Sequence, residues 1–138
     1  MTERTLAIIK PDAVERRLAG MIVRRIEDEG FQIRAMRRVH LLKKQAEGFY
    51  DVHRGRPFFA TLTDFMSSGP AIVLVLEADD AIKKWRTLMG ATDPAKADPG
   101  TLRKELGQSI DRNVTHGSDA PETAAYEIGY FFPGVELI

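Results

Sequence analysis

The residue best placed for chemistry is His116, which lies in the segment Asn113-Val-Thr-His-Gly-Ser-Asp119. A neutral imidazole is a competent nucleophile towards phosphorus, and a phosphohistidine would split a transfer reaction into two steps. Gly117 removes a side chain beside it, so a bulky ligand could approach. A helix should begin just beyond, capped by Ser118 or Asp119, and free amide groups there would favour an anion. The spacing alone fits a simple helix entry equally well.

The other two histidines, His40 and His53, have structural explanations. His40 ends a predicted strand. His53 lies between a predicted helix and the turn at residues 54–57, where a favourable interaction with the C-terminal end of the helix accounts for it. Neither histidine requires a catalytic role.

Three cations are candidates for a phosphate site. Lys10 follows a predicted buried strand, Arg86 lies in a predicted helix, and Arg103 lies in a long loop. Phosphoryl transfer depends mainly on stabilising charge at the phosphate oxygens, to which arginine donates in pairs and lysine acts as a point charge. Each cation alone is most simply a solvated surface charge. Only their convergence would make a site.

Nucleotide and metal motifs that would define a known site are missing from the sequence. There is no glycine-rich phosphate loop of the P-loop type and no dinucleotide-binding turn. No H-x-x-x-H pattern or carboxylate cluster suggests a metal cage. Mg²⁺, if used, is therefore expected to be coordinated mainly by the substrate phosphates.

The elements that must position these residues follow from hydrophobic patterning. Strands are predicted at residues 5–9, 31–41 and 71–76, and helices at 18–29, 43–52, 57–66, 79–88 and 119–129. Residues 90–117 contain several glycines and prolines and few periodic apolar positions, which predicts a long segment with little regular structure that is either functional or disordered. Residues 130–132 fit either a short strand or the last helical turn.

This order of elements predicts an α+β fold with a sheet covered on one face. A ferredoxin-like split βαβ arrangement with an antiparallel sheet is one solution, although its fourth strand is poorly marked.

Composition narrows the class of protein. The 138 residues fit a single domain, and 43% of them are hydrophobic, enough for a core. Because 20 Lys+Arg offset 20 Asp+Glu, we expect no specific nucleic-acid partner. The absence of cysteine excludes disulfides and thiolate sites and fits the cytoplasm. We expect neither a signal peptide nor a membrane span.

Several motifs in register carry a resemblance to a known family. They lie at residues 8–14, 48–50, 56–59, 65–70, 90–94, 100–103 and 113–119. In order and spacing they resemble the nucleoside diphosphate kinases, over about residues 4–132. The resemblance implies a ferredoxin-like domain in which a nucleoside triphosphate phosphorylates His116 and a nucleoside diphosphate then takes the phosphoryl group, a ping-pong mechanism.

The resemblance also implies a role for each matching position. His116 would be the nucleophile, with Tyr50 beside it and Glu127, supported by Ser118, holding its other nitrogen. Phosphate contacts would come from Lys10, Arg86, Thr92 and Arg103. Asn113 would contact the sugar with Lys10 nearby, and the base would stack on Phe58, with Leu62 and Ile110 lining the slot. Since stacking uses a face that every base has, broad base specificity is expected.

Three positions depart from the family pattern. Leu106 replaces a usual aromatic residue, Asp93 a commoner Asn, and Ala120 a commoner Ser. Family members form hexamers or tetramers from a shared dimer, so a homo-oligomer is expected. Two other hypotheses remain open on the residues alone: a non-catalytic nucleotide-binding module, and a structural or regulatory oligomer component.

Overall fold

The computed structural model describes residues 2–134, which form four strands and seven α-helices. The strands are β1 (Thr2–Ile9), β2 (Gln32–Val39), β3 (Ala71–Asp79) and β4 (Thr115–Gly117). The helices are α1 (Pro11–Glu15), α2 (Ala19–Asp28), α3 (Lys43–Phe49), α4 (Phe59–Met66), α5 (Ala81–Met89), α6 (Leu102–Leu106) and α7 (Pro121–Phe131). Two short 3₁₀ helices, η1 (Asp51–His53) and η2 (Pro94–Lys96), complete the set.

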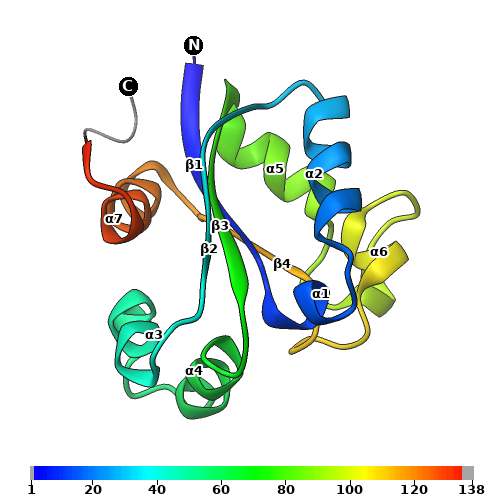
Figure 1. Cartoon of the computed structure of the whole chain (residues 1–138). Coiled ribbons are helices and arrows are strands. Elements are labelled where there is room, and N and C mark those ends of the chain that lie inside the picture. Colours follow the sequence, from blue (N-terminus) through cyan, green and yellow to red (C-terminus); the bar gives the residue numbers. More distant parts are fainter. Residues whose placement is uncertain (1, 135–138) are drawn as a thin grey trace.

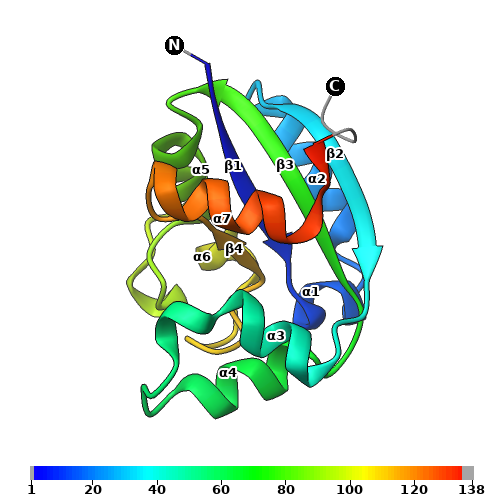
Figure 2. The same cartoon turned by 90° about the vertical axis from the view of Figure 1, so that its left-hand side faces the viewer.

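The strands form one antiparallel sheet in the order β2-β3-β1-β4 (Figure 1). Helices α1 and α2 connect β1 to β2, and α5 begins the connection from β3 to β4, which gives the predicted ferredoxin-like arrangement. Helices α3 and α4 are an insertion between β2 and β3 that extends beyond one end of the sheet (Figure 2). The α+β prediction is therefore confirmed.

Helices cover both faces of the sheet, so the expectation of one covered face was wrong. Along β1, Ala7 and Ile9 belong to one buried cluster, whereas Leu6 and Ile8 belong to another. Helices α2 and α5 cover the first face, and α7 with the α3–α4 hairpin covers the second (Figure 1). The physical reason was visible in the sequence, because continuous apolar strands such as those of β1 and β3 are typical of sheets buried on both sides.

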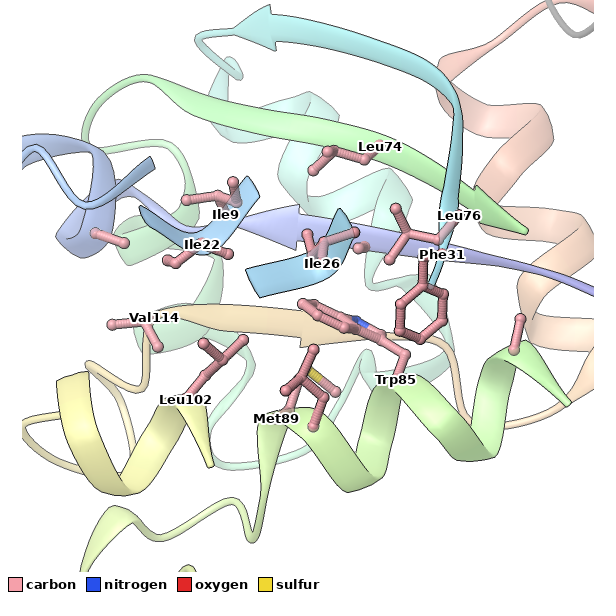
Figure 3. Packing of buried hydrophobic residues seen from close by; sticks show 14 residues of the cluster. Ile9, Ile22, Ile26, Phe31, Leu74, Leu76, Trp85, Met89, Leu102 and Val114 are labelled. Atoms are coloured by element: carbon pink, nitrogen blue, oxygen red, sulfur yellow. The ribbon is translucent and has the colours of Figure 1, made fainter. Parts of the chain in front are cut away.

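The first cluster packs around Trp85 of α5. Its indole meets the ring of Phe31 edge-on, with centroids 6.2 Å apart, and it lies beside Ile26 and Met89 beneath the sheet (Figure 3). Leu106 packs against the same cluster at the end of α6, so an aliphatic residue there is accommodated. None of the helices in residues 2–134 is long and apolar enough to cross a membrane.

Residues 90–117 are more regular than predicted. This segment contains η2, α6 and β4, although much of the rest is irregular. Strand β4 has only three residues, too few for a periodic signature in the sequence. It pairs with the end of β1, which places His116 opposite Ile8.

Several boundaries also differ from the prediction. Helix α1 was not predicted, because Pro11 was taken only as the end of a strand, whereas it also begins this helix. Helix α3 ends at Phe49 rather than at residue 52. Tyr130 and Phe131 form the last turn of α7, which decides the alternative left open there.

Candidate active site

His116 lies on the face of β4 that looks towards α3 and α7. Its ring is close to the rings of Phe49 and Tyr50, at centroid distances of 5.4 and 5.8 Å. Its Nε2 lies 2.9 Å from Oε1 of Glu127 on α7, and the Ser118 hydroxyl donates to the same oxygen at 2.8 Å. When Nε2–H donates to Glu127, the lone pair resides on Nδ1, which becomes the nitrogen able to attack.

Tyr50 forms a neutral wall beside the histidine. Its side chain is buried, and burial together with nearby Glu127 raises the pKa of Tyr50 above its usual range. The hydroxyl makes no hydrogen bond to any residue in the described part of the chain. Tyr50 thus shields one side of the imidazole without contributing charge.

Lys10, Asn113 and Thr92 meet at the end of β1. The Lys10 ammonium donates to Oδ1 of Asn113 at 2.8 Å, and the Asn113 amide donates to the Thr92 carbonyl at 3.1 Å. Lys10 and Asn113 are buried, whereas Thr92 is exposed. Three segments far apart in the chain are therefore tied together by side-chain hydrogen bonds.

The surroundings of Lys10 disfavour the charged form of its ammonium group. Burial, followed by the positive charge of Arg103, lowers the pKa of Lys10 from 10.5 to about 8. Asp12 and Asp111 oppose this shift. A buried cation whose charged form is disfavoured by its surroundings is well suited to receive an anion.

Arg103 comes from α6 and is likewise buried. It donates to the carbonyls of Gly90 and Thr115, at 3.0 and 2.8 Å, and its Nε has no partner within residues 2–134. Burial and the charge of Arg86 lower the pKa of Arg103 to about 10, so it stays protonated at neutral pH. Its guanidinium is fixed beside the strand that carries His116.

Arg86 differs because it is about half exposed and is paired with Asp119 across a distance of 2.9 Å. An open cavity of about 760 Å³ adjoins this pair and is also lined by Thr92. The structure thus brings Lys10 and Arg103 into a buried group and places Arg86 at its more open side.

The three residues expected around a base differ in exposure. Phe58 and Ile110 are 45% and 56% exposed, whereas Leu62 is partly buried against the second cluster. The segment that carries Ile110 lies beside α4, because the Arg112 guanidinium sits 5.6 Å from the centroid of Phe65. Ile110 and Leu62 therefore belong to neighbouring segments.

Two expectations about the neighbours of His116 were wrong. A Cβ on Gly117 would lie 2.6 Å from the Trp85 ring, so this glycine makes room for the core rather than for a ligand. Neither Ser118 nor Asp119 caps α7: Ala120 is the N-cap, and the Thr123 hydroxyl accepts from the amides of Asp119 and Ala120. Those amides are therefore not free for an anion.

Sequence reasoning missed two residues that hold the backbone around His116. The Trp85 indole donates to the His116 carbonyl at 3.0 Å, and Oδ2 of Asp12 accepts from the Val114 amide at 3.1 Å. A single tryptophan and an aspartate after Lys10-Pro11 were the only signals, and both fitted ordinary structural roles.

The other two histidines are placed differently from each other. His40 contacts the Ser67 carbonyl at 3.2 Å, in line with a structural role. His53 ends η1 rather than an α-helix, and its ring lies between those of Tyr50 and Phe58, at 6.3 and 5.3 Å.

A histidine held by a carboxylate can act as a nucleophile, and buried cations close to its strand can stabilise a phosphoryl group in transfer. A family model described as nucleoside diphosphate kinase matches residues 3–137. A nucleoside diphosphate kinase of Geotalea daltonii is 62% identical over 136 residues, and one of Syntrophotalea carbinolica is 63% identical, each alignment covering 99% of both chains.

Solved structures give the same result. The Aquifex aeolicus nucleoside diphosphate kinase is 45% identical, has a TM-score of 0.97 and matches over 100% of both chains. A halophilic nucleoside diphosphate kinase from Halobacterium salinarum, in complex with CDP, is 38% identical with a TM-score of 0.95, covering 100% of this chain and 92% of that one. The chain belongs to the nucleoside diphosphate kinase family, whose enzymes transfer phosphate between nucleotides.

Proposed function

We propose that His116 carries the phosphoryl group between nucleotides. In the first step Nδ1 attacks the γ-phosphorus of a nucleoside triphosphate, typically ATP; the N–P bond forms, the bond to the β,γ-bridging oxygen breaks, and the diphosphate leaves with the bond electrons. In the second step a nucleoside diphosphate attacks the phosphohistidine and restores the imidazole. The hydrogen bond between His116 and Glu127 is the observation that carries this proposal, because it leaves Nδ1 available and stabilises the cationic ring that forms.

The cations stabilise the moving charge. Lys10 and Arg103 are buried and fixed by hydrogen bonds, so they face the phosphates without reorganisation. Arg86 and Thr92 complete the phosphate contacts from the open side, and Asn113, already bound to Lys10, holds the sugar. Ser118 acts through Glu127, and Tyr50 limits access of water to the ring.

The exposed apolar slot accepts any base. Phe58 provides a stacking surface, with Leu62 and Ile110 closing the slot, and none of the three side chains has a polar group that could read base edges. A relative that binds CDP is consistent with a slot that accepts pyrimidines. Orientation then comes from phosphates and sugar, which all substrates share.

Mg²⁺ enters with the nucleotide. No group of three or more His, Cys, Asp or Glu residues in the described chain could hold a metal, and the cationic side chains fit phosphates instead. The ion supplies charge neutralisation when bound, held mainly by the nucleotide phosphates. We also propose a single domain spanning residues 1–138, a cytoplasmic location, and a homo-oligomer, a hexamer or tetramer built from dimers.

Labelling with γ-labelled ATP and no acceptor tests the mechanism. The wild-type chain should acquire an acid-labile, base-stable label at His116, which GDP and CDP should both remove. His116→Ala should bind nucleotide without becoming labelled, while His40→Ala, a matched histidine variant, should label normally. An unlabelled wild-type chain would favour a nucleotide-binding module instead.

A further inference from the structure

Asp12 is a buried carboxylate for which the proposed mechanism has no use. It lies in the first turn of α1, directly after Lys10-Pro11, and is 1% exposed. Its Oδ2 accepts the amide of Val114 from 102 residues away in the chain. Its Oδ1 has no hydrogen-bond partner within residues 2–134. Burying a carboxylate in this way is costly, so the contact it makes needs an explanation.

Val114 is the residue that needs this contact. Its φ is +66°, in the left-handed region that β-branched residues strongly avoid. The Thr115 amide bonds to the Asn113 carbonyl at 2.8 Å, so Val114 is the centre of a strained γ-turn. Such a conformation persists only where the surroundings enforce it.

The end of β1 and the start of α1 enforce it from two sides. The Lys10 amide donates to the Val114 carbonyl at 2.8 Å, and Asp12 accepts the Val114 amide. Both polar groups of the strained residue are thereby fixed by one short segment. Without Asp12, a buried amide would be left unpaired in a turn that already favours another conformation.

The turn stands between two groups of the active site. Asn113 precedes it and meets Lys10, while β4, with His116, follows it. Strand β4 has three residues, so its backbone pairing alone cannot absorb a change of the turn without moving His116. Asp12 also offsets, with Asp111, the effects of burial and Arg103 on the Lys10 ammonium, which the Phe65 ring faces from α4 at 5.9 Å.

We infer that Asp12 is a positioning residue for phosphoryl transfer: its carboxylate holds the left-handed turn at Val114, and so sets Asn113 against Lys10 and His116 in line for attack. This inference rests on the proposed function of His116. It assigns to Asp12 an effect on the rate of transfer in the folded protein, beyond any effect on stability.

Three variants separate these effects. Asp12→Ala removes the acceptor, whereas Asp12→Asn keeps a carbonyl oxygen that can accept the Val114 amide. Ala13→Gly is the control, because Ala13 is buried next in the same short helix and has no side-chain polar group that could hold Val114. Each is measured for Tm and, well below it, for the single-turnover rate of His116 labelling by ATP.

Asp12→Ala should slow labelling about a hundredfold, the usual effect of misplacing a reacting group by about 1 Å. Asp12→Asn should restore most of that rate at neutral pH, but its rate should start to fall at a lower pH than in the wild type, because Lys10 has lost a neighbouring negative charge. Ala13→Gly should lower Tm and leave the rate of the folded protein unchanged. Val114→Gly, placed in the Asp12→Ala background, should recover part of the rate, since glycine adopts a positive φ without a clamp.

Labelling of Asp12→Ala at the wild-type rate, or an Asp12→Asn rate as low as that of Asp12→Ala, would overturn the inference while leaving His116 as the carrier. Failure of Val114→Gly to raise the rate would contradict the turn as the route of the effect. An unlabelled wild-type chain would instead overturn the proposed function and, with it, this inference.

Discussion

The two ends of the active site are built in opposite ways. At the proposed phosphate end, Lys10, Asn113 and Arg103 are buried, Lys10 donates to Asn113, and Arg103 donates to backbone carbonyls. At the proposed base end, Phe58 and Ile110 are about half exposed and apolar. On the proposed function, this difference makes the site selective for phosphate geometry and tolerant of any base, because preorganised polar groups discriminate between ligands and exposed stacking surfaces do not.

Glu127 holds the imidazole of His116 in place, so Glu127→Ala should reduce the rate of transfer more than any of the changes described below. Without the carboxylate the imidazole loses its orientation and its preferred tautomer, and transfer should fall about a hundredfold or more. Nucleotide affinity should change little, since Glu127 binds His116 and Ser118. The measurement is the single-turnover labelling rate beside the Kd for ADP.

Glu122→Ala is the matched control, because Glu122 is an exposed glutamate in the first turn of the same helix. It should leave labelling unchanged. A normal labelling rate in Glu127→Ala would mean that the histidine is oriented by its ring neighbours, Phe49 and Tyr50. Glu127 would then not belong to the preorganised part of the site.

The same contrast explains what could be predicted from the sequence. The continuous apolar runs of β1 and β3 and the amphipathic periodicity of α2 and α5 are clear in the sequence, so the fold class followed from local patterns. The convergence of Lys10, Arg103 and His116 did not, because each is an ordinary cation or histidine until the sheet order brings β1 and β4 together. Only the resemblance to the family predicted that these three residues act at one site.

Two other features could not be predicted correctly from the sequence. A positive φ at Val114 contradicts the preference of its residue type, so no local rule predicts the turn. Gly117 was misinterpreted because a glycine beside a nucleophile fits ligand access as well as it fits close packing. Only the position of Trp85 decides between them.

Raising the pH should weaken nucleotide binding through the contacts to the phosphates. Since the pKa of Lys10 in the free chain is about 8, the ammonium loses its proton above that pH, and ADP affinity should fall about tenfold for each further pH unit. Calorimetric titrations from about pH 6.5 to about pH 9.5, a range that brackets this pKa, should show proton uptake on binding when buffers of different ionisation enthalpy are compared. Lys10→Met should bind weakly with no such pH dependence.

The free energy of unfolding, in contrast to the ADP affinity, should increase as the pH rises. The pKa of Lys10 is 10.5 in the unfolded chain and about 8 in the folded one, so between these values the unfolded chain binds more protons. The penalty of burying the ammonium is therefore fully present below about pH 8 and is relieved as the pH rises towards 10.5.

An ADP affinity that stays constant through pH 8 would show that Lys10 does not meet the phosphates.

Phe58→Ala tests the exposed end. Loss of stacking should weaken binding by about 1–3 kcal/mol, and by similar amounts for ADP, GDP and CDP. The control is a ligand rather than a variant: ribose 5-diphosphate has no base, so its affinity should be unchanged. A loss confined to one nucleotide, or one shared by ribose 5-diphosphate, would mean that Phe58 does more than offer a stacking surface.

Arg86 lines the open cavity beside the proposed phosphate end, and breaking its ion pair should give the smallest effect. Arg86 and Asp119 are both substantially exposed, so their pair is worth at most about 1 kcal/mol. If the guanidinium must leave Asp119 to reach the phosphates, Asp119→Asn should tighten ADP binding by less than about fivefold, and added salt should remove the gain. Asp98→Asn removes the same charge from the rim of the adjoining cavity without touching Arg86, and it should give a smaller change. Weaker binding in Asp119→Asn alone would show instead that Asp119 holds Arg86 ready for the phosphates, which would extend the preorganised end of the site to its open rim.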